Sequence, residues 1–171
     1  MTSPPSEKIT IRQAVPADGP TILTLIRALA DFESLSPPTP EAEHRLIADA
    51  FGTRPRFDIF LAEVAGQVVG YAFVFETYST LLALPTLYLE DLFVLPEFRS
   101  KRVGFKLFRF CVQEAERRGC GRMEWAVLDW NTHAITFYER QKAKHMGEWL
   151  HYRLTADVIA ELNAESSAKD A

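Results

Sequence analysis

A cluster of four cations, Arg99, Lys101, Arg102 and Lys106, lies within a short stretch of the chain. The cluster follows the apolar segment 92–95 and precedes residues with helical spacing, so it coincides with the predicted start of a helix. The first turn of a helix presents unpaired backbone N–H groups and the positive end of the helix dipole, which together stabilise an anion. The pattern indicates a phosphate-binding corner, and a solvated basic helix start is the alternative.

Two carboxylates and a phenol are the other candidates for chemistry. Glu90 and Asp91 are adjacent on a predicted strand, so at most one of them faces a site unless a bulge intervenes. A charge at the sheet edge that points to water is the alternative for Glu90. Tyr138 lies on a later predicted helix, where a phenol with a pKa of about 10 is protonated at neutral pH and can donate a proton. A packing role beside Phe137 is the alternative for Tyr138.

The periodicity of apolar residues predicts the elements that must position these groups. Strands are expected at 8–14, at 57–79 as two strands joined by a tight turn at 65–67, and at 86–96, 122–129 and 147–154. A first helix contains Ile22, Leu25, Ile26 and Leu29 and ends around 34–40, where prolines forbid its continuation. Further helices are expected at 41–51, from 103 to a stop at Gly119, and at 133–141. This order indicates a mixed α/β sheet with at least one crossover.

The composition sets the broad class of protein. The 171 residues are 47% hydrophobic and 25% charged, which fits one globular domain. We expect this domain at 8–158, with a disordered tail at 1–7 and a loose polar tail at 159–171. A formal net charge of −4 argues against a general nucleic-acid binder. No window approaches the ~20 apolar residues of a membrane span and no signal region is recognisable, so a cytoplasmic protein is expected.

Four segments together resemble one enzyme family: "LIRALADFE", "YLEDLFVLPEFR", "AVLDWN" and "ITFYER". They are similar to the GNAT superfamily of acetyl-coenzyme A-dependent N-acetyltransferases, and within it to the diamine (spermidine/spermine) and thialysine acetyltransferase group. The resemblance spans about residues 9–155. It implies a central mixed, mostly antiparallel twisted sheet flanked by helices, in which a splayed strand pair binds acetyl-CoA. The cationic corner then corresponds to the family's turn motif, Gln/Arg-x-x-Gly-x-Gly/Ala.

The resemblance also implies roles for individual residues. Tyr138 is expected to be the general acid that protonates the departing thiolate. Glu90 is expected to bind the amine and to act as a base through water, since an amine with a pKa of about 10 is almost wholly protonated at pH 7. The expected acceptor contacts are Phe32, Glu33, Glu90 and Asp91. The expected coenzyme contacts are Leu92, Phe93, Val94, Arg99, Ser100, Lys101, Arg102, Val103, Gly104, Phe105 and Asn131. An Asx turn before the following helix is the alternative for Asn131.

Several residues depart from the family pattern. Ser100, Arg102 and Lys142 stand where glycine is common. Serine is small and can still donate a hydrogen bond, so we expect Ser100 to cost little. If the position of Arg102 needs a positive φ, a residue other than glycine costs about 1 kcal/mol or somewhat more. The Arg102 side chain then either crowds the pyrophosphate or points outward and adds a phosphate contact. Ser79 stands where polyamine acetyltransferases usually show an acid, which lowers the odds for spermidine and leaves thialysine, lysine and other small amines open.

The resemblance implies direct acetyl transfer from acetyl-CoA to a primary amine, without a metal, in a homodimer. Two alternatives remain, because some residues differ from the family pattern and because the sequence does not identify the acceptor. One is a GNAT-fold binding or regulatory protein that has lost turnover through Arg102 and Lys142. The other is an acetyltransferase that acts on protein amines.

Overall fold

The computed structural model describes residues 8–169, and the chain divides into two compact units at the Ala126–Val127 bond. The first unit contains the sheet and three of the helices. The second contains two helices and the segment between them. None of the helices within residues 8–169 is both long enough and apolar enough to cross a membrane.

The sheet of the first unit has five strands in the order β1-β2-β3-β4-β5 within the described residues. Their bounds are β1 Ile9–Gln13, β2 Asp58–Val64, β3 Gln67–Ser79, β4 Leu84–Val94 and β5 Arg122–Glu124. The first four strands are antiparallel neighbours, and β5 lies parallel to β4. The parallel pair requires a crossover, so the expected mixed sheet is confirmed.

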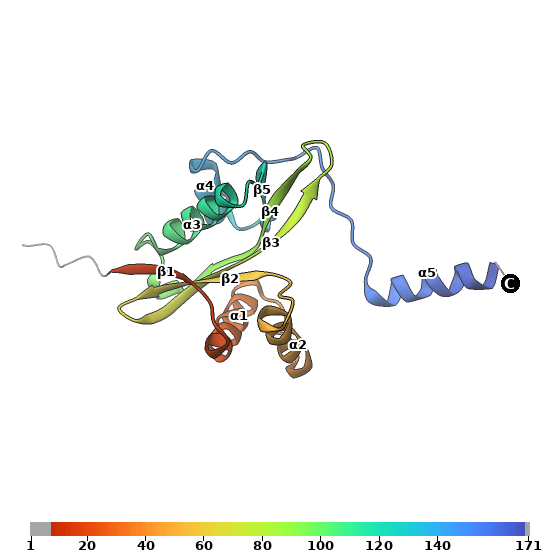
Figure 1. Cartoon of the computed structure of the whole chain (residues 1–171), viewed down its shortest axis with the longest axis horizontal. Coiled ribbons are helices and arrows are strands. Elements are labelled where there is room, and N and C mark those ends of the chain that lie inside the picture. The colour runs from red at the N-terminus through yellow and green to blue at the C-terminus, as the bar shows by residue number, and fades with distance from the viewer. Residues whose placement is uncertain (1–7, 170–171) are drawn as a thin grey trace, which may run out of the picture. The chain divides into compact units, whose positions relative to one another are not determined.

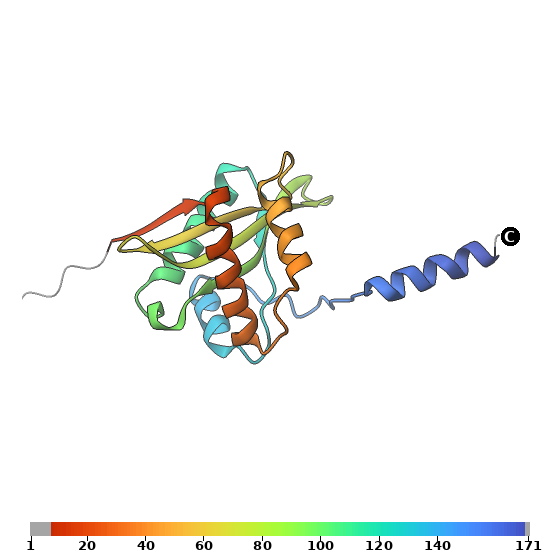
Figure 2. The same ribbon diagram turned by 90° about the horizontal axis from the view of Figure 1, so that it is seen from below.

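Helices cover both faces of this sheet. Helices α1 (Gly19–Glu33) and α2 (Pro40–Phe51) lie on one face, and α3 (Val103–Arg117) lies on the other (Figure 1). In the view from below, α1 and α2 both lie in front of the strands (Figure 2). The core under α1 and α2 is built from Ile22, Leu25, Ala50, Ile59, Leu61, Tyr71, Phe73 and Phe93. Since these strand residues share one face, their neighbours in the sequence point toward α3.

A β-bulge changes the register of β4 at Glu90. Phe73 of β3 pairs with Asp91, whereas the next residue, Val74, pairs with Leu89, so Glu90 is the extra residue. A bulge bends the strand and turns its side chains relative to a regular ladder. The bulge that the sequence left open as a possibility is therefore present at Glu90, directly before Asp91.

Strand β4 extends well beyond its pairing with β5. The two strands pair only from Thr86 to Tyr88 on β4, because β5 ends at Glu124 instead of continuing to residue 129 as expected. From Leu89 to Val94, β4 has no strand partner on the β5 side within residues 8–169. This end of β4 is the open half of the expected splayed pair.

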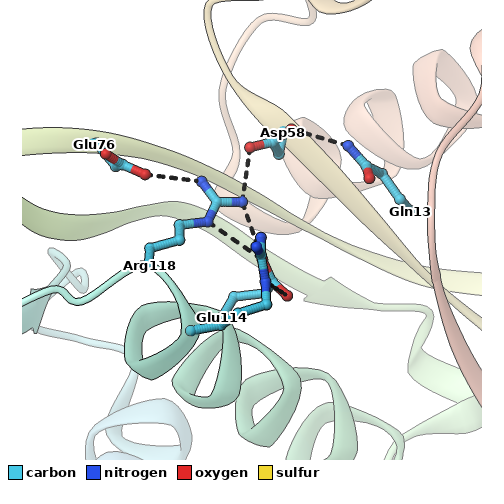
Figure 3. Close-up of polar contacts among 6 residues, drawn as sticks. Gln13, Asp58, Glu76, Glu114 and Arg118 are labelled. Atoms are coloured by element: carbon cyan, nitrogen blue, oxygen red, sulfur yellow. Dashed lines mark hydrogen bonds and ion pairs between the residues drawn. The ribbon is translucent and has the colours of Figure 1, made fainter.

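An ion network around the half-buried Arg118 fixes the C-terminal end of α3 to the sheet (Figure 3). The guanidinium of Arg118 is 2.8 Å from a carboxylate oxygen of Asp58 on β2, and 3.3 Å from those of Glu76 on β3 and Glu114 on α3. Gln13 donates to the second oxygen of Asp58 at 3.0 Å. The network joins β1, β2, β3 and α3, and so supports the crossover that places the other end of α3 beside β4.

The second unit differs from its expected structure. It contains α4 (Thr132–Arg140) and α5 (Ala156–Lys169). The expected strand at 147–154 is wrong, because this segment has no regular secondary structure and no strand of the described chain pairs with it. Its apolar side chains are exposed, Trp149 by 71% and Tyr152 by 90%. Residues 159–169 of the expected polar tail belong to α5.

Several residues other than glycine adopt left-handed backbone conformations. Within the described residues they are Ser34, Ala65, Ala83, Ser100, Arg102 and Lys142, with φ between 50° and 66°. Three of them, Ser100, Arg102 and Lys142, are the positions where the sequence departs from the family's glycines.

Candidate active site

Three carboxylates gather where the C-terminal end of α1 meets the bulge of β4. Burial, together with the negative charges of Glu90 and Glu33, raises the pKa of Asp91 to about 6. Burial also raises the pKa of Glu33. Glu90, at the bulge, is exposed. The structure therefore brings together Glu33, Glu90 and Asp91, which the sequence placed among the acceptor contacts, in an arrangement that favours binding of a cation.

Tyr71 supports this cluster from β3. Its hydroxyl donates a hydrogen bond to a carboxylate oxygen of Asp91 at 3.3 Å, which partly offsets the effect of burial on the pKa of Asp91. Tyr71 itself is fully buried, and burial and the charge of Asp91 raise the pKa of its phenol, so it remains a donor. Sequence reasoning missed Tyr71. The available signal was a tyrosine within the otherwise apolar "VVGYAFVF", since a buried hydroxyl needs a partner.

An aromatic wall adjoins the carboxylates. The rings of Phe32 on α1 and Phe93 on β4 lie 6.5 Å apart, and the guanidinium of Arg99 stacks on both, at 4.4 Å and 5.6 Å from the ring centroids. The Arg99 Nε donates to the carbonyl oxygen of Val94 at 2.9 Å. Burial lowers the pKa of Arg99. The Arg99 side chain, expected at the coenzyme, thus lies against the residue expected to contact the acceptor.

The phosphate-binding corner adopts the backbone of a glycine-rich turn without its glycines. Ser100 has a φ of 64° and Arg102 a φ of 66°. A left-handed residue other than glycine costs about 1 kcal/mol or somewhat more, because its Cβ crowds the following carbonyl oxygen. This cost depends on the presence of Cβ and not on side-chain size. The expectation that Ser100 costs little, because serine is small, is therefore wrong.

Free backbone donors are present at the start of α3. The first hydrogen bond of the helix is donated by the amide of Lys106 to the carbonyl oxygen of Arg102 at 3.0 Å. The amides of Val103, Gly104 and Phe105 come before this bond and therefore have no acceptor within the helix. A Cβ added to Gly104 would lie 3.7 Å from the Val94 side chain. The helix start is therefore packed against β4, next to the open strand edge.

The side chains of this corner fall into two groups. Lys101 and Arg102 are exposed and lie over the rings of Phe98 and Phe105, at 5.1 Å and 5.2 Å from the ring centroids. Of the remaining expected coenzyme contacts on β4 and α3, Leu92 is half-buried, and Phe93, Val94 and Val103 are buried. The side chains of Phe93, Val94 and Val103 are packed in the core, so these three residues can contact a ligand only through their backbone groups.

The second unit holds the other expected site residues. Asn131 caps α4, since its side-chain oxygen accepts from the amide of Ala134 at 3.2 Å, as in the Asx-turn alternative. Tyr138 is half-buried, with its ring 5.3 Å from that of Phe137. Lys142 follows the end of α4 with a φ of 65°, and the next amide, that of Ala143, donates back to the Tyr138 carbonyl. Lys142 thus occupies the left-handed position that usually carries glycine at a helix end.

Comparison with known proteins agrees with these features. Residues 25–142 match the model of the acetyltransferase (GNAT) family. The chain is 35% identical to the thialysine N-epsilon-acetyltransferase of Mus musculus, over 89% of this chain and 95% of that protein. It is 29% identical to the L-ornithine N5-acetyltransferase NATA1 of Arabidopsis thaliana, over 95% and 92% of the two chains.

A solved structure supports the fold. An integron cassette protein from the mobile metagenome of V. cholerae superimposes with a TM-score of 0.76, at 19% identity, over 91% of this chain and 97% of that one. The family match and this superposition confirm the fold implied by the four sequence segments.

Proposed function

This chain belongs to the acetyltransferase (GNAT) family, whose members use acetyl-CoA as co-substrate, and we propose that it acetylates the primary amine of a small polyamine, diamine or lysine-like acceptor. The observation that carries this proposal is the position of the carboxylate cluster. Glu33 and Asp91 adjoin the same end of β4 against which the start of α3 is packed. A cation-binding site and an anion-binding site therefore flank one open strand edge.

The residues of the corner fit a phosphorylated coenzyme. The first-turn amides of α3 provide backbone donors, and Lys101, Arg102 and Lys106 add positive charge at an exposed surface. The unpaired part of β4, from Leu89 to Val94, offers backbone groups for the pantetheine arm and for polarising the acetyl carbonyl. The coenzyme supplies the thioester acetyl group, and the chain supplies binding, orientation and proton transfer.

Proton transfer on the acceptor side is assigned to the carboxylates. Asp91 and Glu33 attract the protonated amine, and Asp91, with its pKa of about 6, is ionised at pH 7 yet basic enough to assist its deprotonation. Glu90 is exposed at the bulge, so it acts through water, as the resemblance implies. The neutral amine then attacks the thioester carbonyl, and the Tyr138 phenol gives its proton to the departing thiolate.

The proposal includes a homodimer as the assembly and the cytoplasm as the location of the protein. From residue 150 to residue 154, apolar residues alternate with polar ones, and Leu150, Tyr152 and Leu154 are exposed. This exposure favours a homodimer in which a second copy covers segment 147–154. Cys111 and Cys120 are free thiols, as is usual in the reducing cytoplasm.

The test is thiol release from acetyl-CoA with a panel of small amines, using the natural protein and Tyr138→Phe. We expect release with at least one amine, and a fall in turnover of roughly 10²-fold or more in the variant, with little change in coenzyme affinity measured by calorimetry. Unaltered turnover in Tyr138→Phe would remove this residue from the mechanism. Absence of release with every amine would contradict the proposed function.

The strained corner favours one rival, a binding protein that no longer turns over. This rival predicts weak or absent binding of acetyl-CoA by the natural protein and tighter binding by Arg102→Gly, because glycine relieves the left-handed strain and the crowding. Micromolar binding by the natural protein, with no gain from glycine, would exclude it.

A further inference from the structure

The guanidinium of Arg99 makes one hydrogen bond, stacks on two rings and experiences the negative charge of Glu97, which partly offsets the effect of burial on its pKa. Its Nε donates to the carbonyl oxygen of Val94 at 2.9 Å, and its plane lies over the rings of Phe32 and Phe93. Within residues 8–169, neither of its two terminal nitrogens has a hydrogen-bond partner, although burial already lowers the pKa of this group. A partly desolvated guanidinium with two parallel free donors is suited to a carboxylate, which it can bind in a bidentate manner.

Arg99 lies on the acceptor side of the sheet. Phe93 faces the core under α1 and α2, and Phe32 belongs to α1, so a guanidinium that stacks on both is on the α1 side. The start of α3 instead approaches the side chains of Leu92 and Val94. Since neighbouring strand residues point to opposite faces, Arg99 and the first-turn amides of α3 lie on opposite sides of β4. Lys101, Arg102 and Lys106 remain available to the coenzyme phosphates.

Asp91 lies on the same face of β4 as the Phe93 ring on which Arg99 stacks. Asp91 and Phe93 pair with Phe73 and Tyr71, so they are two residues apart in a regular part of β4 and share one face. Two strand residues span ~7 Å along the backbone, and an extended lysine-like molecule is of comparable length, so such a molecule can reach from Asp91 along the Phe93 ring. A ligand whose amine lies at Asp91 would therefore bring its carboxylate toward Arg99, along the aromatic wall of Phe93 and Phe32.

We propose that Arg99 binds the carboxylate of an amino-acid acceptor, while Asp91 and Glu33 hold its side-chain ammonium group. The site then discriminates between a lysine-like amino acid and a diamine of the same length, which offers Arg99 a second cation in place of an anion. This inference rests on the proposed function, because it assigns the acceptor class of the same site.

The test compares L-lysine with cadaverine, which is the same molecule without the carboxylate. The quantity measured is the ratio of kcat/KM for lysine to that for cadaverine, in which effects on coenzyme binding and on folding cancel. We expect the natural protein to prefer lysine, and Arg99→Met, which keeps an unbranched apolar stem over the rings, to lower the ratio roughly 10- to 100-fold. Arg99→Lys keeps the charge and should recover part of the preference.

Lys101→Met is the matched control, because it removes a cation of the same corner that lies over Phe98 instead of Phe32. We expect it to raise the KM for acetyl-CoA and to leave the lysine to cadaverine ratio unchanged. An unchanged ratio in Arg99→Met would show that Arg99 does not bind the acceptor carboxylate. A natural protein that acetylates cadaverine as well as lysine would show the same. Either result would leave the proposed function standing. Absence of thiol release with every amine would overturn the proposed function as well.

Discussion

Asp91 is the residue whose protonation should limit the reaction at low pH. Its pKa of about 6 means that the carboxylate becomes protonated as the pH falls below that value, and it then neither attracts an ammonium group nor accepts a proton. We expect kcat/KM for the acceptor to show a bend near pH 6, with a steeper fall on the acid side. Asp91→Asn should have low activity and should lack this bend. A bend that persists in the variant would assign it to another group.

The same residue should oppose folding at neutral pH. The pKa of Asp91 is raised from 3.8 in a free side chain to about 6, so the folded protein binds this proton more tightly than the unfolded chain. The effect is absent below about pH 4, where both states are protonated, and reaches roughly 1–3 kcal/mol of destabilisation above pH 6. Urea unfolding should therefore show Asp91→Asn to be more stable than the natural protein at pH 7.5. The two should be nearly equal at pH 3.5, and equal stabilities at pH 7.5 would contradict the burial of this carboxylate.

At the scale of elements, the start of α3 contains removable strain. Arg102→Gly should raise the free energy of unfolding by about 0.5–1 kcal/mol, because glycine adopts the observed φ of 66° without a Cβ clash. Lys106→Gly is the control, since Lys106 lies inside α3, where glycine should instead destabilise by up to about 1 kcal/mol. Both values follow from urea titrations. Changes of the same sign in the two variants would argue against the left-handed conformation.

The other end of α3 depends on one arginine. The side chain of Arg118 is only 15% exposed and binds three carboxylates, so Arg118→Met leaves three acids close together, two of them half-buried. We expect a loss of about 1–3 kcal/mol in the free energy of unfolding. Arg117→Met is a matched control, since Arg117 is 67% exposed and pairs with Glu114. Its loss should be clearly smaller, because an exposed ion pair contributes little, and a loss equal to that of Arg118→Met would show that the half-buried position of Arg118 contributes little.

The sequence predicted the elements whose apolar spacing is strong and local. Helices α1 to α4 and strands β1 to β4 were expected close to their observed bounds. The bulge at Glu90 was not predictable in position, because it depends on the pairing of β4 with β3. The strand expected at 147–154 has the right alternation, but a strand also needs a neighbour.

The candidate site was predictable in its residue types and less so in its geometry. The acids at 33, 90 and 91 and the cationic corner were recognisable from the four segments. The side chain of Arg99 was expected at the coenzyme, yet it stacks on Phe32, a contact between residues far apart in the sequence. Tyr71 was missed because its hydrogen bond to Asp91 depends on strand pairing. The roles of Tyr138 and Asn131 stay predictions.

At the scale of the whole molecule, segment 147–154 should determine assembly. Leu150, Tyr152 and Leu154 alternate with polar residues and are exposed by 59% to 90%. If a second copy covers them, sedimentation velocity should show a dimer that Tyr152→Asp converts to a monomer. Arg153→Asp is the control, because residue 153 would lie on the opposite face of an extended segment. A natural protein that sediments as a monomer would contradict the proposed homodimer.

The left-handed residues also bear on how readily this protein could change. Each of the six could become glycine without removing a packed core side chain, and each such change would recover up to about 1 kcal/mol. Together these glycine substitutions would raise the stability of the protein, and a more stable protein tolerates more destabilising substitutions. Directed evolution toward new acceptors could therefore begin from a background with glycine at Ser34, Ala65 and Lys142, which lie outside the carboxylate cluster and the phosphate-binding corner.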